Sequence, residues 1–193
     1  MKIKFTIGSR HSFALALCVS LGLCNTASPT ALAHMSVAKL TQASRLIVRA
    51  RCVETKSAWD AGEIWTFTAL EATEIWKGPT QSRVNIRLLG GRVGNLTSHV
   101  SGVPRFRIGE EVVLFLVPTT HGDFSVVSWV QGTFRIHQNP RTGMDTVTQD
   151  SALFDTFDPS TKTFVASGVR DIPLEEFHAQ VSAALIQKTG AQK

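Results

Sequence analysis

The stretch Arg45-Leu46-Ile47-Val48-Arg49-Ala50-Arg51-Cys52 alternates between two kinds of side chain with a two-residue period. Its apolar positions Leu46, Val48, Ala50 and Cys52 share one side, and the three arginines share the other with Ile47. Because successive side chains of a strand point to opposite faces, the pattern predicts a half-buried β-strand whose arginines face solvent. The period also places Cys52 in the core, where burial raises the pKa of a thiol and makes it inert.

Further segments along the chain have the composition or alternation of strands. They are residues 63–76, 83–88, 112–117, 124–130, 133–137 and 144–148, with a short strand at 163–166 inside a loop from 150 to 170. The poor alternation of residues 63–76 predicts either a bulge or a strand covered on both faces. The continuous apolar run 112–117 predicts a strand buried on both faces, and 144–148 is expected at a sheet edge.

Two segments have helical spacing. Val37, Leu40 and Ala43 suggest one or two turns before the first strand. A longer helix is expected to start near Pro173 with Glu175 and Glu176 in its first turn, and to end before Gly190. Its apolar stripe consists of Leu174, Phe177, Val181 and Leu185.

The strand pattern indicates a mainly β protein without internal repeats. A sheet of six or seven antiparallel strands has edges that invite pairing with other chains, and bulges with glycine bends allow it to close. We therefore predict a small, partly closed antiparallel barrel over residues 34–170. The helix in residues 171–193 is expected to pack on this barrel through its apolar stripe.

The first 33 residues have the features of a secretory signal peptide. Lys2, Lys4 and Arg10 precede an apolar stretch at 13–23, and Ala31-Leu32-Ala33 matches a cleavage site before His34. The apolar stretch is too short to span a bilayer, and no later segment approaches the required length. We expect a secreted or periplasmic protein; lipid attachment at Cys24 is disfavoured because Leu23 precedes it.

Charge and cysteine content exclude several classes of protein. The formal net charge is +5, but after residue 33 the chain has 17 basic and 15 acidic residues, so nucleic acid is not an expected partner. Cys52 is the one cysteine after residue 33, so the exported domain has no internal disulfide. It must be stabilised by its hydrophobic core.

Four segments between about residues 40 and 138 resemble a group of uncharacterised exported bacterial proteins. They are Trp76-Lys77-Gly78, Gly90-Gly91-Arg92-Val93-Gly94, Gly102 to Leu116, and Gln131-Gly132-Thr133-Phe134-Arg135-Ile136. The order of elements also resembles the netrin-like module of tissue inhibitors of metalloproteinases. That resemblance implies an OB-like barrel.

The resemblance to the inhibitors raises protease inhibition as an alternative function. Those inhibitors place an N-terminal cysteine on the catalytic zinc of the protease and hold it with disulfides. This chain has His34 at the expected mature start and cannot form an internal disulfide. The sequence therefore departs from the family at the residues that carry inhibition.

The irregular, glycine-rich segment 90–109 is the candidate binding region, because long loops in compact domains are often functional. The candidate binding residues are Trp59, Arg92, Asn95, His99 and Arg105. Trp59 lies in a turn and is expected to be exposed. At least two of the other tryptophans, Trp65, Trp76 and Trp129, are expected in the core.

The sequence contains no recognisable catalytic set, and we expect no catalytic residues and no cofactor. Ser98 and His99 lack a nucleophile elbow, and 90–94 lacks the spacing of a nucleotide-binding loop. We interpret the chain as an exported non-catalytic domain that binds an extracytoplasmic protein, a protease or a cell-envelope component. A copper-dependent enzyme remains an alternative, with the amine and imidazole of His34 as metal ligands.

Overall fold

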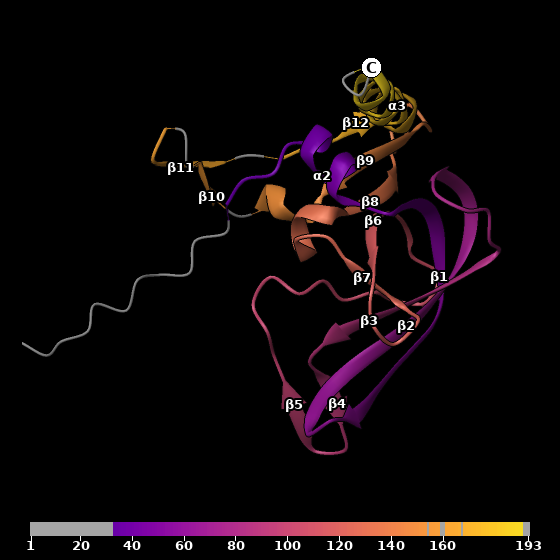
Figure 1. The fold of residues 1–193 in the computed structure, drawn as a ribbon, viewed down its shortest axis with the longest axis vertical. Helices are drawn as coiled ribbons and strands as arrows, with labels where there is room; N and C mark the ends of the chain where they lie inside the picture. Colours follow the sequence, from indigo (N-terminus) through magenta and orange to yellow (C-terminus); the bar gives the residue numbers. More distant parts are fainter. Residues whose placement is uncertain (1–32, 154, 159–160, 167, 191–193) are drawn as a thin grey trace, which may run out of the picture. The chain divides into compact units, whose positions relative to one another are not determined.

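The computed structural model describes residues 33–153, 155–158, 161–166 and 168–190 (Figure 1). Residues 1–32 of the expected signal peptide lie outside the described part. The described chain is mainly β, with one large sheet and a C-terminal helix. None of its described helices is long and apolar enough to cross a membrane.

The elements follow one another in this order: α2 (Val37–Ala43), β1 (Leu46–Asp60), β2 (Glu63–Lys77), β3 (Arg83–Leu89), β4 (Gly91–Val93), β5 (Leu96–Ser98), β6 (Glu111–Pro118), β7 (Phe124–Val126), η1 (Trp129–Gly132), β8 (Thr133–Gln138), β9 (Asp145–Gln149), η2 (Asp150–Leu153), β10 (Asp155–Asp158), β11 (Thr163–Ala166), β12 (Ile172–Pro173) and α3 (Leu174–Gly190).

The large sheet closes partly on itself. Its strand order is β1-β2-β3-β7-β6-β8-β9-β12, and β1 pairs with β6 as well as with β2. Strands β1, β2, β3, β7 and β6 therefore form a ring, which is antiparallel except where β3 meets β7 at Ile86 and Phe124. The prediction of a mainly β, partly closed sheet is confirmed.

Strand β1 is about twice as long as the sequence pattern suggested, because it continues to Asp60. Its second half pairs with β2, for example Lys56 with Phe67. That half is mostly outside the core, so it lacks the alternation that marks residues 46–52. The predicted irregularity is present as register shifts in the β1–β2 pairing near Val48, Ala50 and Glu54.

Two hydrophobic clusters lie on opposite faces of β1 and β6. One cluster contains Val48 of β1 and Leu114 of β6 together with Leu70, Val84 and Ile86 from β2 and β3. The other contains Ile47 and Phe115 together with side chains from the two helices, such as Phe177. The expected burial of 112–117 on both faces is confirmed. The placement of Ile47 on a solvent face was wrong, because helices cover that face.

Helix α3 packs through the predicted stripe. Phe177 and Val181 have no exposed surface, and the Phe177 ring lies 4.4 Å from the ring of Phe134. Figure 1 shows α3 beside α2 and β12. The helix extends through Gly190, one residue beyond its predicted end.

The segment Trp76-Lys77-Gly78 connects β2 to both helices. Trp76 packs against Phe177 of α3, with ring centroids 5.9 Å apart. The Lys77 ammonium donates to the carbonyl of Thr41, 2.6 Å away, and to that of Ser44, at the C-terminal end of α2. At Gly78, a Cβ atom would lie 2.9 Å from the carbonyl oxygen of Arg45. Structural contacts therefore account for all three residues of the Trp76-Lys77-Gly78 segment.

Three other expectations are corrected by the structure. The segment 90–109 contains a hairpin, β4–β5, and is not irregular throughout. The expected strand 124–130 ends at Val126, and Trp129–Gly132 forms a 3₁₀ turn. Strand β9 is not at an edge, because it pairs with β8 and with β12. The short strand at 163–166 is confirmed as β11, paired with β10.

Candidate functional site

The hairpin β4–β5 is fixed against the long strands β1 and β2. The Thr66 hydroxyl donates to the carbonyl of Gly90 at 2.6 Å. Gly91 approaches so closely that a Cβ atom would lie 2.3 Å from Ser57 Oγ, and its φ of +146° also favours glycine. Arg105 links the end of β5 to β2, because its guanidinium donates to the Ser98 carbonyl at 3.1 Å and to Thr66 Oγ1 at 3.2 Å. Hydrogen bonds therefore hold this part of the candidate loop in place.

The candidate binding residues occupy different positions around this hairpin. Trp59 is 54% exposed, as expected, but it lies on β1 because that strand continues to Asp60, and the turn follows at residues 61–62. Arg92 lies on β4 and donates to the carbonyl of Gly94, while the exposed Asn95 lies in the hairpin turn. His99 is exposed after β5, and Arg105 has the hydrogen bonds that fasten the loop.

The segment that begins at Ala33 is bound to the body of the domain. The backbone N–H of His34 donates to the carbonyl of Phe157 at 3.0 Å. Fully buried Gln131 accepts from the N–H of Met35 at 2.7 Å and donates to the carbonyl of Ala33 at 2.8 Å. Inhibition of a protease by this segment would require it to leave Gln131.

Metal binding at His34 needs further ligands close to it. Within the part of the chain that the structure describes, no group of three or more His, Cys, Asp or Glu side chains is arranged to hold a metal ion. Cys52 is buried on the core side, as predicted. Burial, followed by the charge of Glu110, raises the pKa of its thiol.

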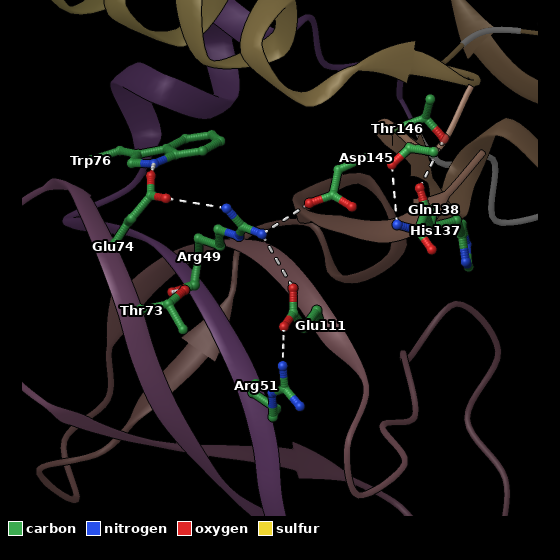
Figure 2. A network of polar contacts seen from close by, with 11 residues as sticks. Arg49, Arg51, Thr73, Glu74, Trp76, Glu111, His137, Gln138, Asp145 and Thr146 are labelled. Atoms are coloured by element: carbon green, nitrogen blue, oxygen red, sulfur yellow. Dashed lines mark hydrogen bonds and ion pairs between the residues drawn. The ribbon is translucent and has the colours of Figure 1, made fainter. Parts of the chain in front are cut away.

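An ion-pair network that the sequence did not reveal surrounds Arg49 on the outer face of β1 (Figure 2). The Arg49 guanidinium contacts Glu74 at 3.1 Å, Asp145 at 3.1 Å and Glu111 at 3.3 Å. Glu111 also pairs with Arg51. The expectation that the arginine face is simply solvated was wrong for Arg49, whose side chain is 22% exposed.

The network shifts the protonation equilibria of its members. The hydrogen bond from the Trp76 indole N–H, followed by that from Arg49, lowers the pKa of Glu74 below its ordinary 4.5, although burial acts in the opposite direction. Burial disfavours the charged form of Arg49, but hydrogen bonds from Arg49 to Glu111 and Glu74 outweigh it and raise the pKa of the guanidinium. The charged forms of both side chains are therefore stabilised.

A pocket of about 470 Å³ adjoins the network, between the sheet and the first turn of α3. Its lining residues are Arg49, Glu74, Trp76, Met144, Asp145, Pro173, Leu174, Glu175 and His178. The Trp76 ring lies 4.5 Å from the His178 ring, and its N–H donates to Glu74 Oε2 at 2.9 Å. Trp76 is thus held in one orientation beside the pocket.

The expectation that at least two of Trp65, Trp76 and Trp129 lie in the core was wrong, because none of the three is fully buried. Trp129 is 37% exposed and has a φ of +50°. Trp65 is partly exposed and lies over the Arg87 guanidinium, whose central carbon is 4.4 Å from the ring centroid. Arg87 also pairs with Asp60 and is 5% exposed.

Strand register brings the network together. Arg49 lies directly opposite Glu74 in the β1–β2 pairing, and Arg51 lies opposite Glu111 in the β1–β6 pairing. Opposite charges at such positions stabilise a sheet. The alternation of arginines in β1 was visible in the sequence, but the register that pairs Arg49 and Arg51 with acids 25 and 60 residues away was not.

Comparison of the sequence with protein-family models gives no match, and no curated protein is significantly similar to it.

Proposed function

We propose that this chain is an exported, non-catalytic domain with an OB-like barrel that binds another protein or a cell-envelope component. The five-stranded ring supports the OB-like assignment, because that fold is a partly open five-stranded barrel. The signal-like features of residues 1–33 support export. Segment 90–109 and the adjoining end of β1 are the proposed contact surface.

The observation that carries this proposal is the fixed hairpin β4–β5 with apolar side chains exposed on it and near the end of β1. Leu96 is 59% exposed on β5, and Trp59 is 54% exposed on β1. Arg92 and Asn95 add polar groups to the hairpin. A surface that is already ordered loses less conformational entropy on binding than a flexible loop does. Aromatic and arginine side chains also contribute strongly to protein interfaces.

Site-specific photo-crosslinking in cells that export the protein tests this surface. A photoreactive amino acid at Leu96 is compared with one at Ile186, which is 72% exposed on α3. We expect a discrete crosslinked species from position 96 that disappears when Arg92→Glu and Trp59→Ser are added. Equal crosslinking from both positions, or none from position 96, would refute the proposed surface; far-UV circular dichroism checks that each variant folds.

A further inference from the structure

The pocket beside Arg49 is lined by side chains that are not part of the hairpin β4–β5, so it is separate from the proposed contact surface. Its lining combines the aromatic ring of Trp76, which is held in place by its contacts, with acidic side chains. Trp76 is held by its hydrogen bond to Glu74 and by its contacts with His178 and Phe177. Met144, which is 54% exposed, adds apolar surface, as do Pro173 and Leu174.

The charges in this pocket favour a cation over an anion. Among the described residues that line it, Arg49 is the one Arg or Lys side chain, and it already contacts three carboxylates. An anion would have to displace one of those contacts. Glu74, Asp145 and Glu175 together outnumber Arg49, and Glu175 offsets the partial positive charge of the α3 N-terminus. The pocket therefore has an excess of negative charge.

We propose that this pocket binds one basic side chain, preferentially arginine, of a polypeptide partner. Its volume of about 470 Å³ is within the usual range of ligand pockets. The alkyl stem of an arginine would lie along Met144 and Leu174, as such stems do on apolar surfaces. The planar guanidinium would stack beside Trp76 and pair with Asp145 and Glu175.

Calorimetric titration of the full chain with small peptides tests the assignment. The probe is acetyl-Gly-Arg-Gly-amide, and the matched peptide with citrulline keeps the shape without the charge. We expect saturable binding of the arginine peptide that weakens as salt is raised, and at least about fivefold weaker binding of the citrulline peptide. Equal affinities, or no binding of the arginine peptide at millimolar concentration, would overturn the proposal.

Two variants in the first turn of α3 separate this pocket from a general charge effect. Glu175 lines the pocket, whereas the neighbouring Glu176 does not, and both side chains are exposed. We expect Glu175→Gln to weaken binding of the arginine peptide about fivefold and Glu176→Gln to leave it nearly unchanged. Equal losses in both variants would contradict the pocket assignment. Tighter binding of spermidine than of the peptide would contradict the assignment to a polypeptide side chain.

Discussion

Replacement of Arg49 by methionine removes the charge at the centre of the ion-pair network while keeping most of the side-chain stem. Arg49 makes three ion pairs at 3.1 to 3.3 Å, and 22% of its side chain is exposed. Exposed ion pairs contribute about 0.2–1 kcal/mol each, whereas leaving a buried partner unpaired costs about 3–5 kcal/mol. For this partly buried site we expect the free energy of unfolding at pH 7 to fall by about 2 kcal/mol.

The loss of unfolding free energy caused by Arg49→Met should become smaller as the pH falls. The folded-state pKa of Glu74 is lowered, so stability from its charged form is fully present above its ordinary value of 4.5 and is lost as pH falls through the lower folded value. Arg49→Met removes part of this lowering and leaves the Trp76 hydrogen bond. The difference in unfolding free energy between wild type and variant should therefore be largest near pH 7 and smaller near pH 3.

Urea unfolding followed by circular dichroism at both pH values measures this difference. Arg83→Met is the matched control, because Arg83 forms an ion pair with Glu54 at 3.1 Å and its side chain is 58% exposed. We expect that control to change stability by less than about 0.5 kcal/mol. The reasoning is refuted if Arg49→Met and Arg83→Met have equal effects at pH 7, or if the Arg49→Met effect is unchanged near pH 3.

Three further substitutions test the packing of the domain. Phe177→Ala removes a fully buried ring from the cluster under α3 and should lower the unfolding free energy by about 3–5 kcal/mol in urea titration; a loss below about 1 kcal/mol would contradict the packing. Gly91→Ala places a Cβ atom 2.3 Å from Ser57 Oγ, whereas Gly94→Ala meets no atom within 4 Å, so thermal unfolding should show a clearly larger loss for Gly91→Ala. Lys77→Met leaves the carbonyls of Thr41 and Ser44 without the ammonium donor, so the free energy of unfolding should fall by about 1–2 kcal/mol. Hydrogen exchange at the C-terminal end of α2 should also become faster, and unchanged exchange would argue against a stabilising role of Lys77.

The strands were predictable where one face differs from the other in the sequence. Residues 46–52 alternate because Leu46, Val48 and Cys52 point into the ring, and the run at 112–117 is apolar because both of its faces are covered. The second half of β1 and the hairpin β4–β5 lack such a contrast. Pairing with neighbouring strands, which depends on tertiary structure, places them in sheets.

The candidate sites differ in how far the sequence revealed them. The irregular, glycine-rich composition of segment 90–109 marked it as a candidate region, and the exposure of Trp59 was predicted although its place on β1 was not. The pocket beside Arg49 joins side chains from β1, β2, β9 and α3. Its acids, Glu74, Asp145 and Glu175, are far apart in the sequence and resemble ordinary surface charges, so only the register and the position of α3 identify them.

Strands β1 and β6 contribute neighbouring residues to both hydrophobic clusters, as with Ile47 and Val48 or Leu114 and Phe115. Neither cluster can be exposed to water without removing support from these strands. The ring and its helical cover should consequently unfold in one cooperative transition. A substitution under α3 would then reduce the stability of the distant hairpin β4–β5 through this shared strand pair.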